Sequence, residues 1–250
     1  MGTKFSTRVW VSVVGIASIF FGSKGYADTV ISVADFGLKP DTRENAVAYV
    51  QKAIEACRGK EPVTLVFPEG RYDFWPQYAH EKNYYETNTY DVFPKRLAML
   101  FEGLHNITVD GNGSQFVMHD RIQPITVENC DGVTLKNFSI DWDIPLTAQA
   151  RVTKVGSDFF EIEINVLESP YIIEDGKLVF VGEGWKSALG SMIEFESDTH
   201  FVVPGTGDLV LGRNWRDYTA VSPRYGIVRL SRKGGFERYP AEGNWLVLRH

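Results

Sequence analysis

Two aspartates separated by one residue are the part of the sequence best suited to acid–base chemistry. Asp141 and Asp143 flank Trp142 at the end of an apolar run. On a strand, residues two apart project from the same face, so the two carboxylates would share one face and Trp142 would lie on the other. Carboxyl groups this close raise the pKa of one of them, which suits a proton donor. Hydrolysis of a glycosidic bond uses such a pair, one carboxyl as acid and one as base or nucleophile.

The two aspartates could also be solvated corner residues where one structural region gives way to another. Inverting hydrolysis requires carboxyl groups about 6.5–9.5 Å apart, and neighbouring positions on one strand lie closer than that. We expect Asp141, Trp142 and Asp143 to contact a sugar. Such a close pair would serve inverting hydrolysis only with a further carboxyl group from elsewhere.

A second group of candidate residues is aromatic. Trp75, Tyr78, Tyr84, Tyr85 and Tyr90 lie in an otherwise polar loop region. Sugar rings present C–H faces that stack on aromatic side chains, so Trp75, Tyr84 and Tyr85 are predicted to bind substrate. The alternative is that these rings pin a long loop to the fold.

The sequence gives no reason to expect a metal or another cofactor. Cys57 and Cys130 are the only cysteines, and their spacing fits no metal site. Burial as small hydrophobes is the simpler expectation, and whether they pair stays open. Four histidines also lack a metal-ligand spacing and are expected at the surface or in hydrogen bonds: His80, His105, His119 and His200.

The elements that must position these residues fall into two regions. Residues 30–33, 63–67 and 71–74 are predicted strands, with an amphipathic helix between Thr42, its expected cap, and Cys57. Short β-branched strands separated by Asn, Asp and Gly follow between residues 97 and 140.

A repeat of 26 residues lies within this second stretch. Residues 105–111 align with residues 131–137, and their apolar positions match. Short strands with Asn and Gly corners at such a period are typical of stacked parallel coils, in which each coil buries its inner face against its neighbours. Two β-meander turns that look alike by accident are the alternative. The stacked arrangement predicts one ladder made by Ile107, Val109, Val133 and Leu135.

From residue 148 the pattern becomes antiparallel. Residues 160–166 alternate strictly between apolar and polar, as in a half-buried strand, and Asp175-Gly176 is a hairpin signal. The region 148–246 is therefore predicted to be an antiparallel β-barrel or sandwich.

The first 27 residues are predicted to be a secretory signal peptide. Lys4 and Arg8 precede an apolar run, and Gly25 and Ala27 suit cleavage before Asp28. The remaining chain has 23 basic and 32 acidic residues, a net charge of −9. This charge argues against a nucleic-acid partner, and no later apolar run predicts a membrane span. We expect a periplasmic or secreted protein.

The first 45 residues after the signal resemble the N-terminal cap of pectin-lyase-like β-helix proteins. The resemblance rests on Val33-Ala34-Asp35-Phe36-Gly37, the following helix and Phe67-Pro68-Glu69-Gly70-Arg71-Tyr72. It implies an all-β fold, a right-handed parallel β-helix with an N-terminal capping helix, interrupted or followed by the antiparallel barrel or sandwich. The superfamily includes hydrolases, lyases, esterases and binding proteins, so it leaves the reaction open.

Three further stretches are similar to the bacterial α-1,3-galactosidases of glycoside hydrolase family 110: residues 71–76, 84–88 and 138–143. That resemblance implies an exported glycosidase that removes terminal α-1,3-linked galactose from glycans, such as the blood-group B antigen, by inversion and without a metal. It also implies that the catalytic carboxylates lie beyond His250, so the 250 residues alone would be inactive.

The expected organisation is then a signal over 1–27, the cap and first coils over 28–147, the barrel over 148–246 and a return to the β-helix at 247–250. A polysaccharide lyase on the same fold and a non-catalytic glycan-binding module are the alternatives. A lyase acting on uronates would use a basic cleft, which the acidic composition disfavours.

Overall fold

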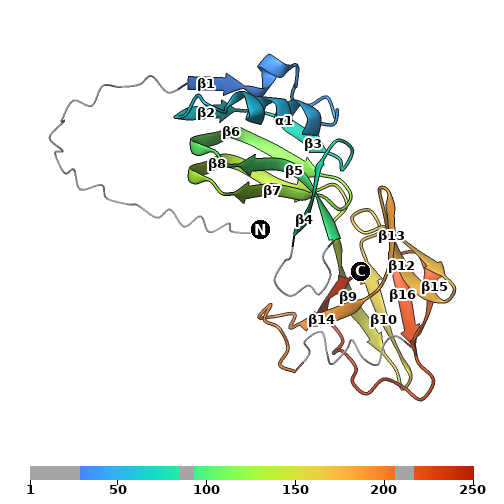
Figure 1. Cartoon of the computed structure of the whole chain (residues 1–250). Helices are drawn as coiled ribbons and strands as arrows, with labels where there is room; N and C mark the ends of the chain where they lie inside the picture. Colours follow the sequence, from blue (N-terminus) through green and yellow to red (C-terminus); the bar gives the residue numbers. More distant parts are fainter. Residues whose placement is uncertain (1–28, 85–92, 206–216) are drawn as a thin grey trace, which may run out of the picture.

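The computed structural model describes residues 29–84, 93–205 and 217–250. The predicted signal peptide lies outside the described residues. Within them, one α-helix and seventeen strands form a parallel region at the N-terminal side and an antiparallel region at the C-terminal side (Figure 1). The described helix is too short to cross a membrane.

The parallel region begins with strand, helix, strand, strand, in the predicted order. Its elements are β1 (Thr29–Ser32), the 3-10 helix η1 (Val33–Phe36), α1 (Val47–Ala56), β2 (Val63–Val66) and β3 (Arg71–Phe74). The helix begins later than the sequence suggested. Thr42 does not cap the helix, because its side chain accepts a hydrogen bond from the backbone N–H of Glu44, before the helix begins. The side chain of Asn45 accepts the N–H of Val47.

Two long strands, β6 (His105–Met118) and β8 (Asp131–Trp142), extend this parallel sheet. β6 pairs with both β2 and β3 on one side and with β8 on the other. Ile107 pairs with Val133 and Val109 with Leu135, so the predicted ladder is confirmed. Ile107 and Val109 are buried, whereas Leu135 is 39% exposed because β8 is the outermost described strand of the sheet.

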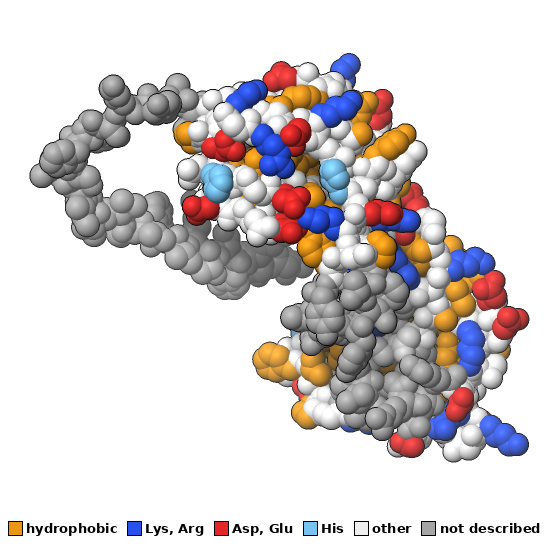
Figure 2. Space-filling view, in the orientation of Figure 1, with side chains coloured by type: hydrophobic (Ala, Val, Ile, Leu, Met, Phe, Trp, Pro, Cys, Tyr) orange, Lys and Arg blue, Asp and Glu red, His pale blue; other side chains and the backbone are white. Residues whose placement is uncertain are grey.

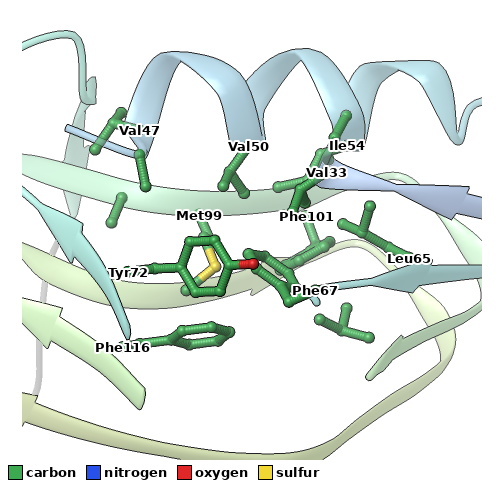
Figure 3. Packing of buried hydrophobic residues seen from close by; sticks show 14 of the residues in the cluster. Val33, Val47, Val50, Ile54, Leu65, Phe67, Tyr72, Met99, Phe101 and Phe116 are labelled. Carbon is green, nitrogen blue, oxygen red and sulfur yellow. The ribbon is translucent and has the colours of Figure 1, made fainter. Parts of the chain in front are cut away.

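A smaller sheet faces the first and contains β4 (His80–Tyr84), β5 (Phe93–Glu102) and β7 (Gln123–Glu128). β5 and β7 are parallel, and β4 runs antiparallel to β5. The apolar face of α1 covers the core between the sheets, where its Val47, Val50 and Ile54 approach the rings and side chains of the strands (Figure 3).

The antiparallel region contains nine strands: β9 (Thr147–Val155), β10 (Phe159–Ile164), β11 (Tyr171–Glu174), β12 (Lys177–Gly182), β13 (Trp185–Ala188), β14 (Ser191–Phe195), β15 (Thr219–Arg224), β16 (Ile227–Ser231) and β17 (Trp245–Arg249). Six form a sheet in the order β14-β17-β9-β10-β16-β15, and β11, β12 and β13 form a second sheet. Phe160, Ile162 and Ile164 are buried in the core of this region, as their alternation predicted.

The end of the chain differs from the sequence-based expectation. Residues 247–249 belong to β17, which pairs antiparallel with β9 and β14, so the chain does not return to the parallel region at residue 247. The physical reason is the alternation along β17, in which side chains two residues apart point to the same face. Leu246 and Leu248 both point into the antiparallel core, where each is fully buried.

Both cysteines are free thiols. Cys57 is buried in the parallel core, as expected for a small hydrophobe. Cys130 is half-buried, and its Sγ lies 3.3 Å from the carbonyl oxygen of Phe101.

Candidate functional site

The candidate site lies where three parallel strands end at the same edge of the sheet. The register joins Phe74 to Met118 and Met118 to Trp142. The residues that follow these three are Trp75, His119 and Asp143. Backbone hydrogen bonds continue the ladder to His119 and Asp143, whose N–H groups donate to Phe74 and Met118. The rings of Trp75 and His119 stack with centroids 3.8 Å apart. Three side chains from distant parts of the sequence are thereby brought together.

A buried carboxylate anchors this edge. Asp73 accepts two hydrogen bonds of 3.0 Å from Nε of Arg71, and its Oδ1 lies 2.8 Å from Nε2 of His119. Burial would raise the pKa of Asp73, but the hydrogen bonds from Arg71 and His119 outweigh it and hold the pKa below its ordinary value. The hydrogen bond to Asp73 in turn raises the pKa of Arg71. Asp73 is therefore ionised and fixes both neighbours.

Arg71 extends the network to Asp143. One guanidinium nitrogen of Arg71 donates to Asp143 at 2.9 Å and to Asp73 at 2.5 Å. The side chain of Asp73 is fully buried, whereas that of Asp143 is 31% exposed. Asp143 thus keeps contact with solvent while its position is fixed by a charged hydrogen bond.

The antiparallel region contributes the remaining carboxylate. Glu183 lies at the tip of the hairpin between β12 and β13, and its Oε2 accepts the indole N–H of Trp75 at 2.8 Å. The same oxygen lies 2.7 Å from Nδ1 of His119. Glycines 182 and 184 flank Glu183, and Gly184 has a positive φ of 74° that suits a tight turn. Glu183 therefore joins the two regions of the chain.

His119 lies between two carboxylates and is almost fully buried. Asp73 lies at one ring nitrogen and Glu183 at the other, each within hydrogen-bond distance. The ring is therefore held in place from both sides.

A metal ion is a second arrangement to test at this edge. One ligand atom from each of His119, Asp143 and Glu183 lies within 4.8 Å of the other two. Each of these groups already binds protein atoms, however, because Asp143 accepts from Arg71 while Glu183 and Nδ1 of His119 bind each other. The neighbouring guanidinium also repels a cation. The geometry fits a hydrogen-bonded network better than a coordination site.

The structure brings together only part of the predicted site. Trp75 and Asp143 belong to the network. Asp141 lies near the end of β8, exposed, and its carboxylate accepts the backbone N–H of Trp142. The indole N–H of Trp142 donates to the backbone of Asp120.

Tyr84, one of the two predicted tyrosines, lies apart from this network. Tyr84 donates to Glu128, which also pairs with Lys82, on the β4–β7 face of the parallel region. That pairing matches the alternative in which the aromatic residues secure the loop. Tyr85 and Tyr90 lie outside the described residues.

The analysis of the sequence did not select Arg71, Asp73 or Glu183 as site residues. It expected His119 at the surface or in hydrogen bonds, and His119 is buried and hydrogen-bonded. The strand register would have indicated His119. Each of Trp75, His119 and Asp143 follows a residue of the same ladder, which joins Phe74, Met118 and Trp142. No sequence signal places Glu183 there, since its contact with His119 spans 64 residues.

Comparison with known proteins gives two results. The family described as GLAA-B beta-barrel domain I matches residues 148–246. "Alpha-1,3-galactosidase B" of Bacteroides thetaiotaomicron is 56% identical over 226 residues, which cover 90% of this chain and 36% of that protein. The chain is a homologue of bacterial alpha-1,3-galactosidases. The predicted resemblance to bacterial α-1,3-galactosidases is thereby confirmed.

Other alpha-1,3-galactosidases give the same picture. "Alpha-1,3-galactosidase A" of Shewanella woodyi is 33% identical over 220 residues, 87% of this chain and 35% of that protein. "Alpha-1,3-galactosidase B" of Akkermansia muciniphila is 29% identical over 231 residues, 91% of this chain and 28% of that protein. The chain spans about a third of the length of these alpha-1,3-galactosidase relatives.

Proposed function

We propose that this chain is part of an exported glycosidase that removes terminal α-1,3-linked galactose from glycans. The observation that carries the proposal is the 56% identity to a protein named alpha-1,3-galactosidase B, over 90% of the chain. The predicted signal peptide supports export to the periplasm or beyond the cell.

Within that enzyme, we propose that Trp75, Asp143 and Glu183 bind the sugar. The side chains of Asp143 and Glu183 are 31% and 45% exposed, so both carboxylates can accept hydrogen bonds from sugar hydroxyls. Arg71 and His119 hold them in place, and preorganised acceptors of this kind fix a ligand's orientation. Asp141 and Trp142, the last two residues of β8 before Asp143, are proposed to contact the substrate more weakly.

The catalytic carboxyls are proposed to come from other parts of the enzyme. Inversion, which the family resemblance implies, uses two carboxyls about 6.5–9.5 Å apart with a water between them. The nearest oxygen atoms of Asp143 and Glu183 lie within 4.8 Å of each other, closer than the separation that inversion uses. These two residues therefore bind sugar in our proposal, and the 250 residues alone do not release galactose.

The proposal includes a fold of the right-handed parallel β-helix type. The parallel register from β1 through β2 and β6 to β8 supports it. Leu135 and Ile140 on β8, and Val127 on β7, are between 38% and 47% exposed. Another coil stacked on β8 and β7 would bury these side chains, as repeat folds require.

The test is galactose release from an α-1,3-linked galactoside by the enzyme that contains these residues. Asp143→Asn and Glu183→Gln should each lower kcat/KM by about tenfold or more, because a charge-assisted hydrogen bond is worth about 1.5–3 kcal/mol. Asp141→Asn should have a smaller effect. Asp131 is exposed and lies at the opposite end of β8 from Asp141. Asp131→Asn is therefore the control and should keep wild-type kinetics.

Two outcomes would contradict the proposal. Wild-type kinetics in both Asp143→Asn and Glu183→Gln would place the sugar contacts elsewhere. Release of an unsaturated product that absorbs in the near ultraviolet, instead of galactose, would assign the protein to the lyases.

A further inference from the structure

A groove on the outer surface of the antiparallel region is separate from the junction network. It has a volume of about 450 Å³ and lies on the β14-β17-β9 side of the six-stranded sheet. Figure 2 shows hydrophobic side chains at the surface of this region, near the place of β14 in Figure 1. Six residues line the groove: Gln149, Phe195, His200, Trp245, Leu246 and Val247.

Strand alternation explains why aromatic side chains face outward here. Leu246 and Leu248 of β17 are buried in the core, so Trp245 and Val247 project to the other face. The register places Phe195 of β14 directly opposite Trp245, and Gln149 of β9 opposite Val247. Trp245 remains 39% exposed, although burying an indole is strongly favourable.

Polar groups border this aromatic surface. Gln149 offers an amide, and His200 offers an imidazole from the turn after β14. Arg151, which is exposed, lies opposite Trp245 on the adjacent strand. A sugar needs both features, because its C–H face stacks on an aromatic ring while its hydroxyls need donors and acceptors at the edge of the ring.

We infer that this groove binds a neutral oligosaccharide that contains galactose. The inference rests on the proposed function, because the relatives are named galactosidases and such an enzyme meets glycan chains longer than the galactose it removes. The volume lies in the range of about 300–1,000 Å³ typical of small-ligand sites. The groove shares no lining residue with the junction network, so it holds the glycan at a second place.

The test measures binding without turnover. The chain is titrated with the disaccharide galactosyl-α-1,3-galactose, and the dissociation constant is measured by calorimetry or by NMR of the tryptophan indole signals. Trp245→Ala should weaken binding at the groove by about tenfold, which corresponds to about 1.4 kcal/mol. Gln149→Ala, an exposed change that leaves the core intact, should weaken it by about threefold.

Tyr225→Ala is the matched control. Tyr225 is also a highly exposed aromatic residue, but it lies between β15 and β16 at the opposite edge of the same sheet. This variant should bind the disaccharide like the wild type. Circular dichroism and melting temperatures of all three variants show whether the fold is retained.

Three results would overturn the inference. The first is that Trp245→Ala and Gln149→Ala both bind the disaccharide as the wild type does. The second is no binding of the disaccharide by the folded chain at millimolar concentration. The third is concentration-dependent self-association that Trp245→Ala abolishes, since the groove would then bind a second copy. None of these results depends on galactose release, so the proposed function is tested separately.

Discussion

At the scale of single residues, one imidazole connects most of the candidate site. His119 contacts Asp73 and Glu183 through its two ring nitrogens and stacks on Trp75 through its face. A histidine in this position has no apolar substitute, because each neighbouring carboxylate would lose a hydrogen-bond partner and stay buried or partly buried. The hydrogen bonding of the network therefore depends on this residue.

The pH dependence of stability should report the buried carboxylate of this network. The folded pKa of Asp73 is lowered, so its contribution to stability is complete above the unfolded pKa of about 3.9 and is lost as the pH falls toward the folded value. Asp73→Asn should cost about 3 kcal/mol at pH 7, because it leaves the charge of Arg71 without its buried partner. The same variant should lose less stability than the wild type when the pH drops below about 4.

Urea denaturation at several pH values measures this effect. Asp131→Asn, at an exposed position, should follow the wild-type curve throughout. A curve for Asp73→Asn that is parallel to the wild-type curve below pH 4 would show that Asp73 does not titrate as described.

At the scale of elements, the sequence predicted what depends on short-range periodicity. The ladder of Ile107 and Val133 followed from a repeat of 26 residues, and the barrel strands followed from alternation such as that of Phe160 to Ile164. The repeat does not hold along the whole strand. Ser114 pairs with Phe138, only 24 residues away, because the register shifts between Asp110 and Ser114.

Contacts between elements were less predictable than the elements themselves. Trp75 and Asp143 were chosen for their chemistry, and the strand register then placed both of them beside His119. The position of Glu183 depends on how a hairpin of the barrel folds back onto the parallel strands, and no local pattern encodes that.

Truncating a buried apolar residue on β6 should lower the free energy of unfolding more than a similar truncation on β8, its partner strand. Ile107→Ala should destabilise the parallel region by about 2–5 kcal/mol, because Ile107 is fully buried and a cavity would remain. Leu135→Ala removes a similar volume from the outer strand, where 39% of the residue is already exposed, and should cost about 1 kcal/mol or less. Chemical denaturation of the two variants compares them directly. Equal costs would show that β8 is covered in solution.

At the scale of the whole molecule, two hydrophobic cores are joined by a polar contact. One core is built from α1 and the parallel strands, and the other from the barrel strands. The hairpin that carries Glu183 spans the junction, with the guanidinium of Arg121 5.6 Å from the Trp185 ring centroid. The relative position of the two regions therefore depends on a few directional interactions.

Glu183→Ala should loosen this junction without unfolding either core. The substitution removes the acceptor for Trp75 and His119, so backbone amides of residues 182–185 should exchange with solvent faster. Amides of β9 and β10 should exchange as before. Hydrogen exchange followed by mass spectrometry measures both, and Glu168→Ala, at an exposed barrel position, is the control. Unchanged exchange at residues 182–185 would mean that other contacts hold the hairpin.

The buried Cys57 gives the parallel core a built-in reporter of its own opening. Burial raises the pKa of this thiol to about 11, so at neutral pH it is almost entirely protonated and shielded from alkylating reagents. Its labelling rate in a Cys130→Ser background therefore measures how often the core exposes its interior. Because the thiol is native to the protein, no foreign probe is needed. A lower labelling rate in the presence of a bound glycan or an added coil would show that the core opens less often.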